Sequence, residues 1–232
     1  MKTALFIASG FVVLFFVPAA FSEEQNWSGL YTGVFVGGQF GHSTDRTGAF
    51  GYNADDTAWR YDESGFTAGG EVGYNFPVGQ VVIGPEIELG YLGMDGSGAQ
   101  PDSPSGDTKG HSGSELYTAL RGRVGLPLGH NLIFATAGLL GANYKKRVVD
   151  DCNLAPCGGS TIDAQKKDFT LGFTVGAGVE RSLGHRFSIK FEYLYFSLDA
   201  QRFSGTTNLG DAYQWSAEAS GHILRGGFNY HF

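Results

Sequence analysis

The segment at the end of the chain limits the fold most strongly, because large apolar residues alternate there with polar residues and glycine. One face carries Leu224, Gly226, Phe228, Tyr230 and Phe232, and the other carries Arg225, Gly227, Asn229 and His231. A repeat of two residues is the period of a β-strand, whereas a helix repeats every 3.6 residues or so. The chain is therefore expected to contain strands with one aromatic, apolar face and one polar face.

The first 22 residues have the pattern of an export signal. Lys2 precedes an apolar run from Ala4 to Val17, and Ala20-Phe21-Ser22 places small residues at the third-last and last positions of a cleavage site. We expect cleavage after Ser22, which makes residues 1–22 a signal peptide and residues 23–232 the mature domain. A retained signal anchor is the alternative, although a membrane helix takes about 20 apolar residues. No later window approaches that length, so a mature chain in a membrane would cross it with strands.

Composition agrees with a strand protein and excludes some partners. The chain has 37 glycines and 14% aromatic residues but only 17% charged residues, and glycine, Phe and Tyr recur at alternate positions. A mature length of about 210 residues suits one domain. The net charge of −7 argues against a nucleic-acid partner, because such proteins usually present a basic face.

The two cysteines, Cys152 and Cys157, lie close together in an exported chain. Their simplest interpretation is one local disulfide formed in an oxidising compartment. A zinc site would need two further ligands, and none lies near them in the sequence. We therefore expect neither a metal nor another cofactor.

Eight segments of the mature chain alternate in the manner of the last one. They cover residues 30–41, 65–76, 81–93, 114–126, 131–145, 169–180, 187–198 and the terminal segment. Short turns at residues 77–80, 127–130 and 182–185 follow the second, fourth and sixth segments. Long, polar, glycine-rich stretches follow the first, third, fifth and seventh. Short turns at one end and long loops at the other are typical of transmembrane barrels.

The distribution of charge decides between two kinds of eight-stranded barrel. A soluble lipocalin-type barrel has an apolar interior and a charged outer face. Here charged residues share one face of each strand with glycine, and large apolar residues fill the other. We therefore predict an all-β fold, an eight-stranded antiparallel up-and-down transmembrane β-barrel. The aromatic residues expected to form girdles at its two membrane borders are Phe76, Tyr230 and Phe232 at one end, and Phe40, Tyr91, Tyr144 and Tyr195 at the other.

Several short motifs resemble one family. They are Trp27-Ser-Gly-Leu-Tyr-Thr-Gly33, Gly69-Gly-Glu-Val-Gly-Tyr-Asn75, Val175-Gly-Ala-Gly-Val-Glu180, Phe191-Glu-Tyr-Leu-Tyr195 and Arg225-Gly-Gly-Phe-Asn-Tyr-His-Phe232. The chain is similar to small eight-stranded outer-membrane proteins of Gram-negative bacteria, related to the OmpA transmembrane domain and the opacity proteins. The alphaproteobacterial, porin-like branch is the most similar. The resemblance implies a cell-surface protein of the outer membrane without indicating what it binds.

The polar strand faces predict a charged barrel interior. The residues expected there are Glu71, Glu86, Glu88, Glu115, Arg121, Arg123, Glu180, Lys190, Glu192 and Arg225. An eight-stranded barrel is only wide enough for side chains to fill it, so these charges should form a desolvated, hydrogen-bonded network. A structural role is the main hypothesis for this network, and a conducting or proton-relaying role is the alternative.

Two further sets of residues indicate partners. The outward aromatic residues Phe228, Tyr230 and Phe232 are expected to be the signal that the barrel-assembly machinery binds. Five basic residues, Lys145, Lys146, Arg147, Lys166 and Lys167, flank the loop that holds the cysteines. We expect them to gather at the outer rim, where they would bind the phosphates of lipopolysaccharide. A solvated rim without a ligand is the alternative.

Three functions are compatible with these features. The first is a non-enzymatic envelope protein whose extracellular loops bind lipopolysaccharide, a host molecule or haem. The second is a small porin, although water-filled channels come with about 16 or more strands. The third is a lipid A-modifying hydrolase, for which Ser220 and His222 share one face of the last strand and Glu218 lies on the same face. His42 and His111, both in predicted outer loops, are the histidines that could meet in space.

Overall fold

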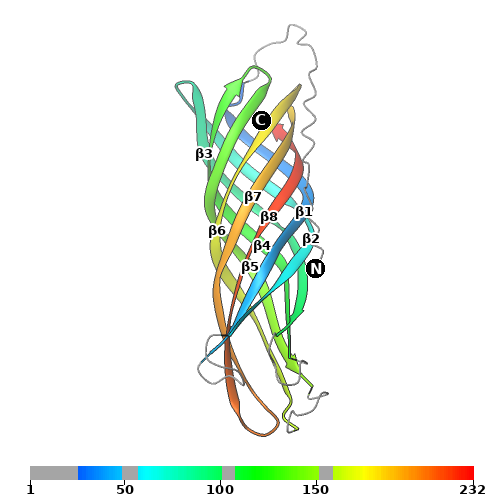
Figure 1. Ribbon diagram of the computed structural model, residues 1–232. Helices are drawn as coiled ribbons and strands as arrows, with labels where there is room; N and C mark the ends of the chain where they lie inside the picture. Colours follow the sequence, from blue (N-terminus) through cyan, green and yellow to red (C-terminus); the bar gives the residue numbers. More distant parts are fainter. Residues whose placement is uncertain (1–25, 49–56, 101–107, 152–158) are drawn as a thin grey trace, which may run out of the picture.

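Eight antiparallel strands form one closed barrel (Figure 1). The structure is a computed structural model that describes residues 26–48, 57–100, 108–151 and 159–232. The strands are β1 (Gly29–Thr47), β2 (Ala58–Val78), β3 (Val81–Ala99), β4 (Lys109–Leu128), β5 (Asn131–Asp150), β6 (Ile162–Gly184), β7 (Phe187–Thr206) and β8 (Ala212–His231). Each strand pairs with the next, and β8 pairs with β1. The predicted fold is confirmed. Within the described residues, no helix has the length and apolar character needed to cross a bilayer.

Three two-residue turns join strands at one end of the barrel. The turns after β2 and β4 place Gly79 and Gly129 in the left-handed region, with φ of 62° and 60°. The turn after β6 uses His185 and Arg186 instead, with φ of 50° and 77°. Two-residue hairpin turns need positive φ because only the primed turn types match the strand twist. The predicted leader, residues 1–22, lies outside the described residues, as do Cys152 and Cys157 and therefore the predicted disulfide.

Large apolar side chains point outward on all eight strands. Val34, Leu139 and Leu224 are each 63% exposed. In a water-soluble protein, most side chains of these types are buried in the core. We call this outward surface the apolar belt. It comprises the outward residues from Leu30 to Phe40, Phe66 to Val78, Ile83 to Tyr91, Leu116 to Leu128, Ile133 to Leu139, Phe169 to Leu183, Phe187 to Tyr193 and Leu224 to Phe232. The period-two pattern thus places its apolar face toward lipid, as expected.

The strands extend well beyond the apolar belt. They are 19 to 23 residues long, whereas about 9 to 11 residues cross a bilayer. The extra length lies at the end opposite the two-residue turns. Part of the long loop expected at residues 42–63 is therefore strand, because β1 continues to Thr47 and β2 begins at Ala58. We call this part of the wall, on the side of the belt opposite the two-residue turns, the strand extension. A position described as above the belt lies on this side.

One seam interrupts the backbone ladder of the strand extension. The β6–β7 ladder runs from Gly172, opposite Leu198, down to Gly184, opposite Phe187. Above Gly172, side chains bridge the two strands. Gln201 Nε2 donates to Thr170 Oγ1 at 3.0 Å, and Lys166 Nζ donates to the Arg202 carbonyl at 3.1 Å.

Apolar and polar layers alternate inside the barrel, and β5 passes through them all. Its inward residues include Leu132, Thr136, Leu140, Lys146 and Val148, in order from the turn end. Leu132 packs with Trp27 and Val82, Leu140 belongs to the middle apolar cluster, and Val148 belongs to the cluster nearest the outer end. Thr136 and Lys146 belong to the two polar layers between these clusters. The interior is therefore packed with side chains along its length.

Candidate functional sites: barrel interior and outer rim

The polar layer nearer the two-residue turns is a network of ion pairs that we call the central ionic cluster. Its members are Glu71, Glu86, Glu88, Arg121, Lys190, Glu192 and Arg225, and none of them is more than 3% exposed. They come from β2, β3, β4, β7 and β8, and each stands on the inward face of its strand. The period-two alternation therefore delivers all seven side chains to one height in the barrel.

Arg121 and Arg225 link most of the carboxylates of this cluster. Arg121 binds Glu86, which lies directly opposite it on β3, and reaches Glu88 at 2.6 Å and Glu192 at 3.1 Å. Arg225 donates to Glu192 at 2.8 Å through Nε and to Glu88 at 2.8 Å through Nη2. Each guanidinium thus satisfies more than one carboxylate, which gives an interlocked network instead of isolated pairs.

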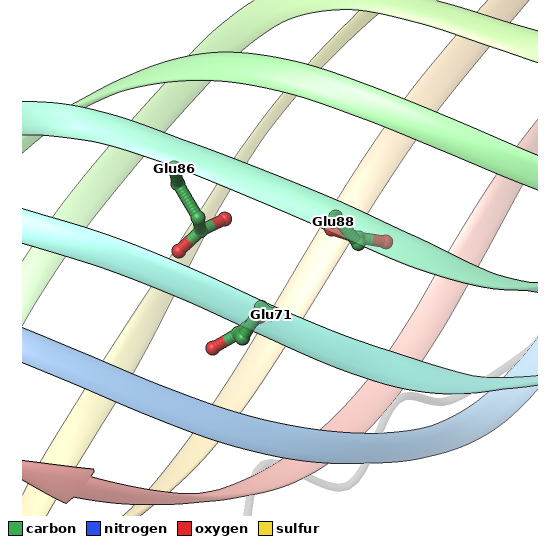
Figure 2. A group of neighbouring side chains, drawn as sticks. All are labelled: Glu71, Glu86 and Glu88. Carbon is green, nitrogen blue, oxygen red and sulfur yellow. The ribbon is translucent and has the colours of Figure 1, made fainter.

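Lys190 provides the remaining positive charge of the cluster. Its ammonium group binds Glu71 and lies 3.9 Å from Glu86 and 3.7 Å from Glu192. Figure 2 shows Glu86 and Glu88 on one strand and Glu71 on its neighbour. One carboxylate oxygen from each of these three residues lies within 4.8 Å of the others. A metal ion here would have to displace the ammonium and guanidinium groups, so the three carboxylates serve as partners of the protein's own cations.

A second buried ion pair lies nearer the turn end. Arg123 binds Glu180, and its guanidinium stacks 4.1 Å above the Phe134 ring. His231 and Asn229 hold the other Glu180 oxygen at 3.0 Å and 2.9 Å. Arg123 stands on β4 beside β3, which carries Glu86 and Glu88, but its ion pair reaches across to Glu180 on β6.

The two buried groups together contain one more carboxylate than cations. Five carboxylates (Glu71, Glu86, Glu88, Glu180 and Glu192) stand against four cations (Arg121, Arg123, Lys190 and Arg225), a difference of 5 − 4 = 1. His231 Nε2 also lies 3.0 Å from Glu180 Oε1. The interior is therefore close to charge balance, which a desolvated network requires.

Glu115 does not belong to this interior, and its predicted placement is wrong. The ladder shifts register between Ser114 and Tyr117, so Glu115 and Leu116 both turn outward. A β-bulge of this kind adds one residue and changes the face on which all earlier residues lie. Glu115 binds Lys145 and, at 2.9 Å, Lys167 on the outer wall. These two cations hold the pKa of Glu115 at about 2.

Lys146 is the opposite case, because it was expected at the outer rim and is buried. The alternation of β5 continues past the predicted strand end at Lys145, so Lys146 shares the inward face of Tyr144. Its ammonium donates to Asp45 at 3.0 Å and to the Tyr61 hydroxyl at 2.9 Å. The same parity buries Tyr144, which was expected in the aromatic girdle.

This upper polar layer also holds Glu63, which accepts a hydrogen bond of 2.9 Å from the Tyr144 hydroxyl. Burial raises the pKa of Asp45 and of Glu63, and burial lowers the pKa of Lys146. Sequence reasoning missed Asp45, Glu63 and Tyr61 as interior groups because it ended the strands at the belt. The signal was present, since the alternation of β1 and β2 continues through these positions.

The other four basic residues of the predicted rim cluster lie on the outer wall of β5 and β6. We call Lys145, Arg147, Lys166 and Lys167 the basic face. Arg147 makes a two-pronged pair with Asp163, at 2.7 Å for both bonds, and Lys166 lies 2.8 Å from Asp168. An open groove of about 630 Å³ runs along this wall. It is lined by Asp95, His111, Ser112, Gly113, Lys145, Lys146, Arg147, Gln165, Lys166 and Lys167.

The pair expected for a hydrolase is not formed. Ser220 and His222 both point outward from β8, but Ser220 Oγ lies 3.2 Å from His42 Nε2, and His222 Nδ1 lies 2.6 Å from the Tyr193 hydroxyl. His42 and His111 stand on β1 and β4, which are not neighbours, so these two histidines do not meet. The outward residues Phe228 and Phe232 are 44% and 63% exposed at the turn end of β8.

The closed barrel, its apolar belt and its filled interior define the class of transmembrane outer-membrane β-barrels. Residues 9–232 match the family model described as outer membrane protein beta-barrel domain. The chain belongs to this family, and it is an outer-membrane protein of a Gram-negative bacterium.

Curated relatives and solved structures agree with this assignment. The chain is 34% identical to the 22 kDa outer membrane protein of Rhizobium leguminosarum bv. viciae, over 77% of this chain and 71% of the relative. It is 29% identical to the 25 kDa outer-membrane immunogenic protein of Brucella canis, over 82% of this chain and 75% of the relative. OprG of Pseudomonas aeruginosa has a TM-score of 0.56 and 12% identity, covering 88% of this chain and 97% of that one. The outer membrane protease OmpT of Escherichia coli has a TM-score of 0.51 and 10% identity, with the same coverage, so both structures show the fold alone.

Proposed function

We propose that this protein is a non-enzymatic envelope protein that fixes a rigid wall in the outer membrane and presents its strand extension to lipopolysaccharide and extracellular ligands. The packed interior is the observation that carries this proposal. The central ionic cluster spans the barrel between two apolar clusters, and its buried side chains bind one another. A barrel with such an interior holds its outer wall in place and leaves no water-filled channel across the membrane.

The small porin is the competing function, and conductance separates the two. The chain, refolded in detergent and inserted into a planar bilayer, should give no single-channel steps at any voltage. Heat-dependent gel mobility would establish that the inserted material is folded. Steady, reproducible steps would overturn the proposal, because they would require continuous water beside Arg121 and Arg225.

The basic face supports lipopolysaccharide as a partner. Its cations stand just above the apolar belt, at the height where an outer-leaflet amphiphile carries its phosphates, and a groove runs beside them. Their acidic neighbours Glu115, Asp163 and Asp168 hold them in place. Arg and Lys held in this manner bind phosphate through charge-assisted hydrogen bonds.

The double variant Lys145→Gln/Lys167→Gln tests this face. We expect its affinity for lipopolysaccharide to fall by about tenfold, the effect of losing one or two charge-assisted contacts. The double variant Arg181→Gln/Arg186→Gln removes the same charge near the turn end and is the matched control. Equal affinities for the two double variants would remove lipopolysaccharide from the proposal.

The assembly machinery is the second proposed partner. Phe228 and Phe232 point outward near the C-terminal end of β8, where a binding protein has access to them. Replacing Phe232 by Ser should slow folding into the outer membrane in cells while leaving refolding in detergent unchanged. An equal loss in both settings would assign Phe232 a purely structural role. The proposed host and haem ligands depend on residues 49–56, 101–107 and 152–158, which lie outside the described chain.

A further inference from the structure

A second polar cluster lies on the outer wall, on the side of the barrel opposite the basic face. It is formed by Arg60 on β2, His42 on β1 and Ser220 and His222 on β8. His42 lies directly between Asp62 and Ser220 in the strand register, and Phe40, the last belt residue of β1, lies opposite His222. The cluster therefore stands one step above the apolar belt. We call it the arginine–histidine cluster.

The hydrogen bonds of this cluster run in one direction. Arg60 Nη2 lies 2.7 Å from His42 Nδ1, and a guanidinium can only donate. His42 Nδ1 therefore accepts, so in the neutral ring Nε2 carries the proton and donates to Ser220 Oγ at 3.2 Å. Ser220 is then left with its own hydroxyl hydrogen to donate outward. A hydrolase would need the reverse arrangement, with Nε2 accepting from the serine.

The Arg60 guanidinium has N–H groups that remain available to a ligand. Among the described residues, its side-chain hydrogen bond goes to His42, through one of its five N–H groups. Asp62 and Glu218 are the acidic groups on the adjoining strands, and His222 is the other titratable neighbour of His42. Partial burial and the Arg60 guanidinium lower the pKa of His42, and Asp62 opposes them. The fixed positive charge of the cluster is thus that of Arg60.

Aromatic rings fix the lower side of the cluster. The His222 ring stacks on Phe40 at 5.3 Å and on Tyr193 at 5.7 Å, and its Nδ1 contacts the Tyr193 hydroxyl. Tyr195 packs against the same imidazole at 5.4 Å. The acyl part of an amphiphile would contact these rings, while its headgroup would meet the donors of Arg60 and Ser220. Such an arrangement of aromatic rings below and donors above suits the boundary between hydrocarbon and headgroups.

We propose that the arginine–histidine cluster binds a phosphate group carried by an outer-leaflet amphiphile, with Arg60 as the main ligand and Ser220 as a second donor. The site deepens the proposed function, since it depends on the barrel standing in the outer membrane. It uses none of the residues of the basic face. The two faces together would hold phosphate-bearing lipid on opposite sides of the barrel.

The test measures binding of the refolded chain to lipopolysaccharide in a Lys145→Gln/Lys167→Gln background, which weakens binding at the basic face. Arg60→Gln should weaken binding by about tenfold, whereas Arg202→Gln, an exposed arginine above the belt on β7, should change it by less than about twofold. Arg60→Lys, which keeps the charge but not the planar fork, should fall between them. Heat-dependent gel mobility would show that each variant is folded.

Two further probes identify the ligand. With dephosphorylated lipopolysaccharide, Arg60→Gln and the parent should bind equally, which would assign the effect to phosphate. Inorganic phosphate should compete only weakly if the ligand is a lipid headgroup, and strong competition would instead make free phosphate the source. Equal loss in Arg60→Gln and Arg202→Gln, or a difference that persists without phosphate groups, would overturn the proposal. Because Lys145 and Lys167 are already absent from the background, failure of the basic face and failure of this site give different results.

Discussion

Removing Arg121 should destabilise the barrel more than any change to an exposed charge. Its side chain is fully buried and touches three carboxylates, Glu86, Glu88 and Glu192. The variant Arg121→Met keeps most of the volume but leaves five buried carboxylates with three cations. Breaking one partner of a buried ion pair costs about 3 to 5 kcal/mol.

The lower end of that range applies here, because other cations remain. Arg225 still binds Glu88 and Glu192, and Lys190 still lies 3.9 Å from Glu86. We therefore expect a loss of about 3 kcal/mol in the free energy of unfolding. With a denaturant slope of about 2 kcal/mol per molar urea, the unfolding midpoint should fall by about 1.5 M.

The assay is equilibrium unfolding by urea in phospholipid vesicles, followed by the fluorescence of Trp27, Trp59 and Trp215. Arg181→Met, at an outward position, is the matched control. Adding Glu86→Gln to Arg121→Met removes the carboxylate whose remaining cation, Lys190, lies 3.9 Å away, and it should restore at least half of the loss. If Arg121→Met costs no more than the control, the carboxylates are screened by water, and the description of a dry, interlocked interior is wrong.

Three further predictions concern other parts of the barrel. Arg186→Gly should stabilise the protein by about 1 kcal/mol, since φ of 77° strains a residue with a Cβ. The same urea titration would detect this gain. A loss of stability would mean that the Arg186 contact with Tyr230 outweighs the strain. Because burial raises the pKa of Asp45 and Glu63 above that of the unfolded chain, both carboxyls oppose folding at neutral pH, so the strand extension should become more stable as pH falls toward these raised pKa values. Glu63→Gln should reduce that pH dependence, and an unchanged profile would exclude Glu63 as its source. In hydrogen exchange, the amides of residues 162–171 that face the seam should exchange faster than those of residues 172–184, and uniform protection would show that the seam closes in solution.

Much of the architecture could be predicted from alternation, because the period of two fixes which residues share a face. Glu86 and Arg121 were both expected inside the barrel, and they lie directly opposite each other in the register. Alternation could not show the bulge between Ser114 and Tyr117, since one extra residue leaves the local pattern almost unchanged. The outward orientation of the Glu115 side chain is therefore evident only from the strand register of the folded barrel.

Lys146 was misplaced for a different reason. Five basic residues near a loop suggest a common rim, and that interpretation assumed a strand end at Lys145. The strand continues to Asp150, so alternation sends Lys145 and Arg147 outward and Lys146 inward. A buried Lys is tolerated only where acidic or hydrogen-bonding groups surround its ammonium group. The partners of Lys146, Asp45 and Tyr61, come from strands far away in the sequence. Partners of that kind cannot be identified without the register of the whole barrel.

The same dependence on register explains how one wall can hold two chemically different surfaces. Where the strands pass through the apolar belt, the charged side chains of the central ionic cluster point inward, away from lipid. Above the belt both faces of the strand meet water or protein, so charges appear on both. Lys146 pairs inside at the same height at which Lys145 and Arg147 pair outside. The strand extension is thus the part of the barrel that is free to vary its outer charges, which is why we place both phosphate-binding faces there.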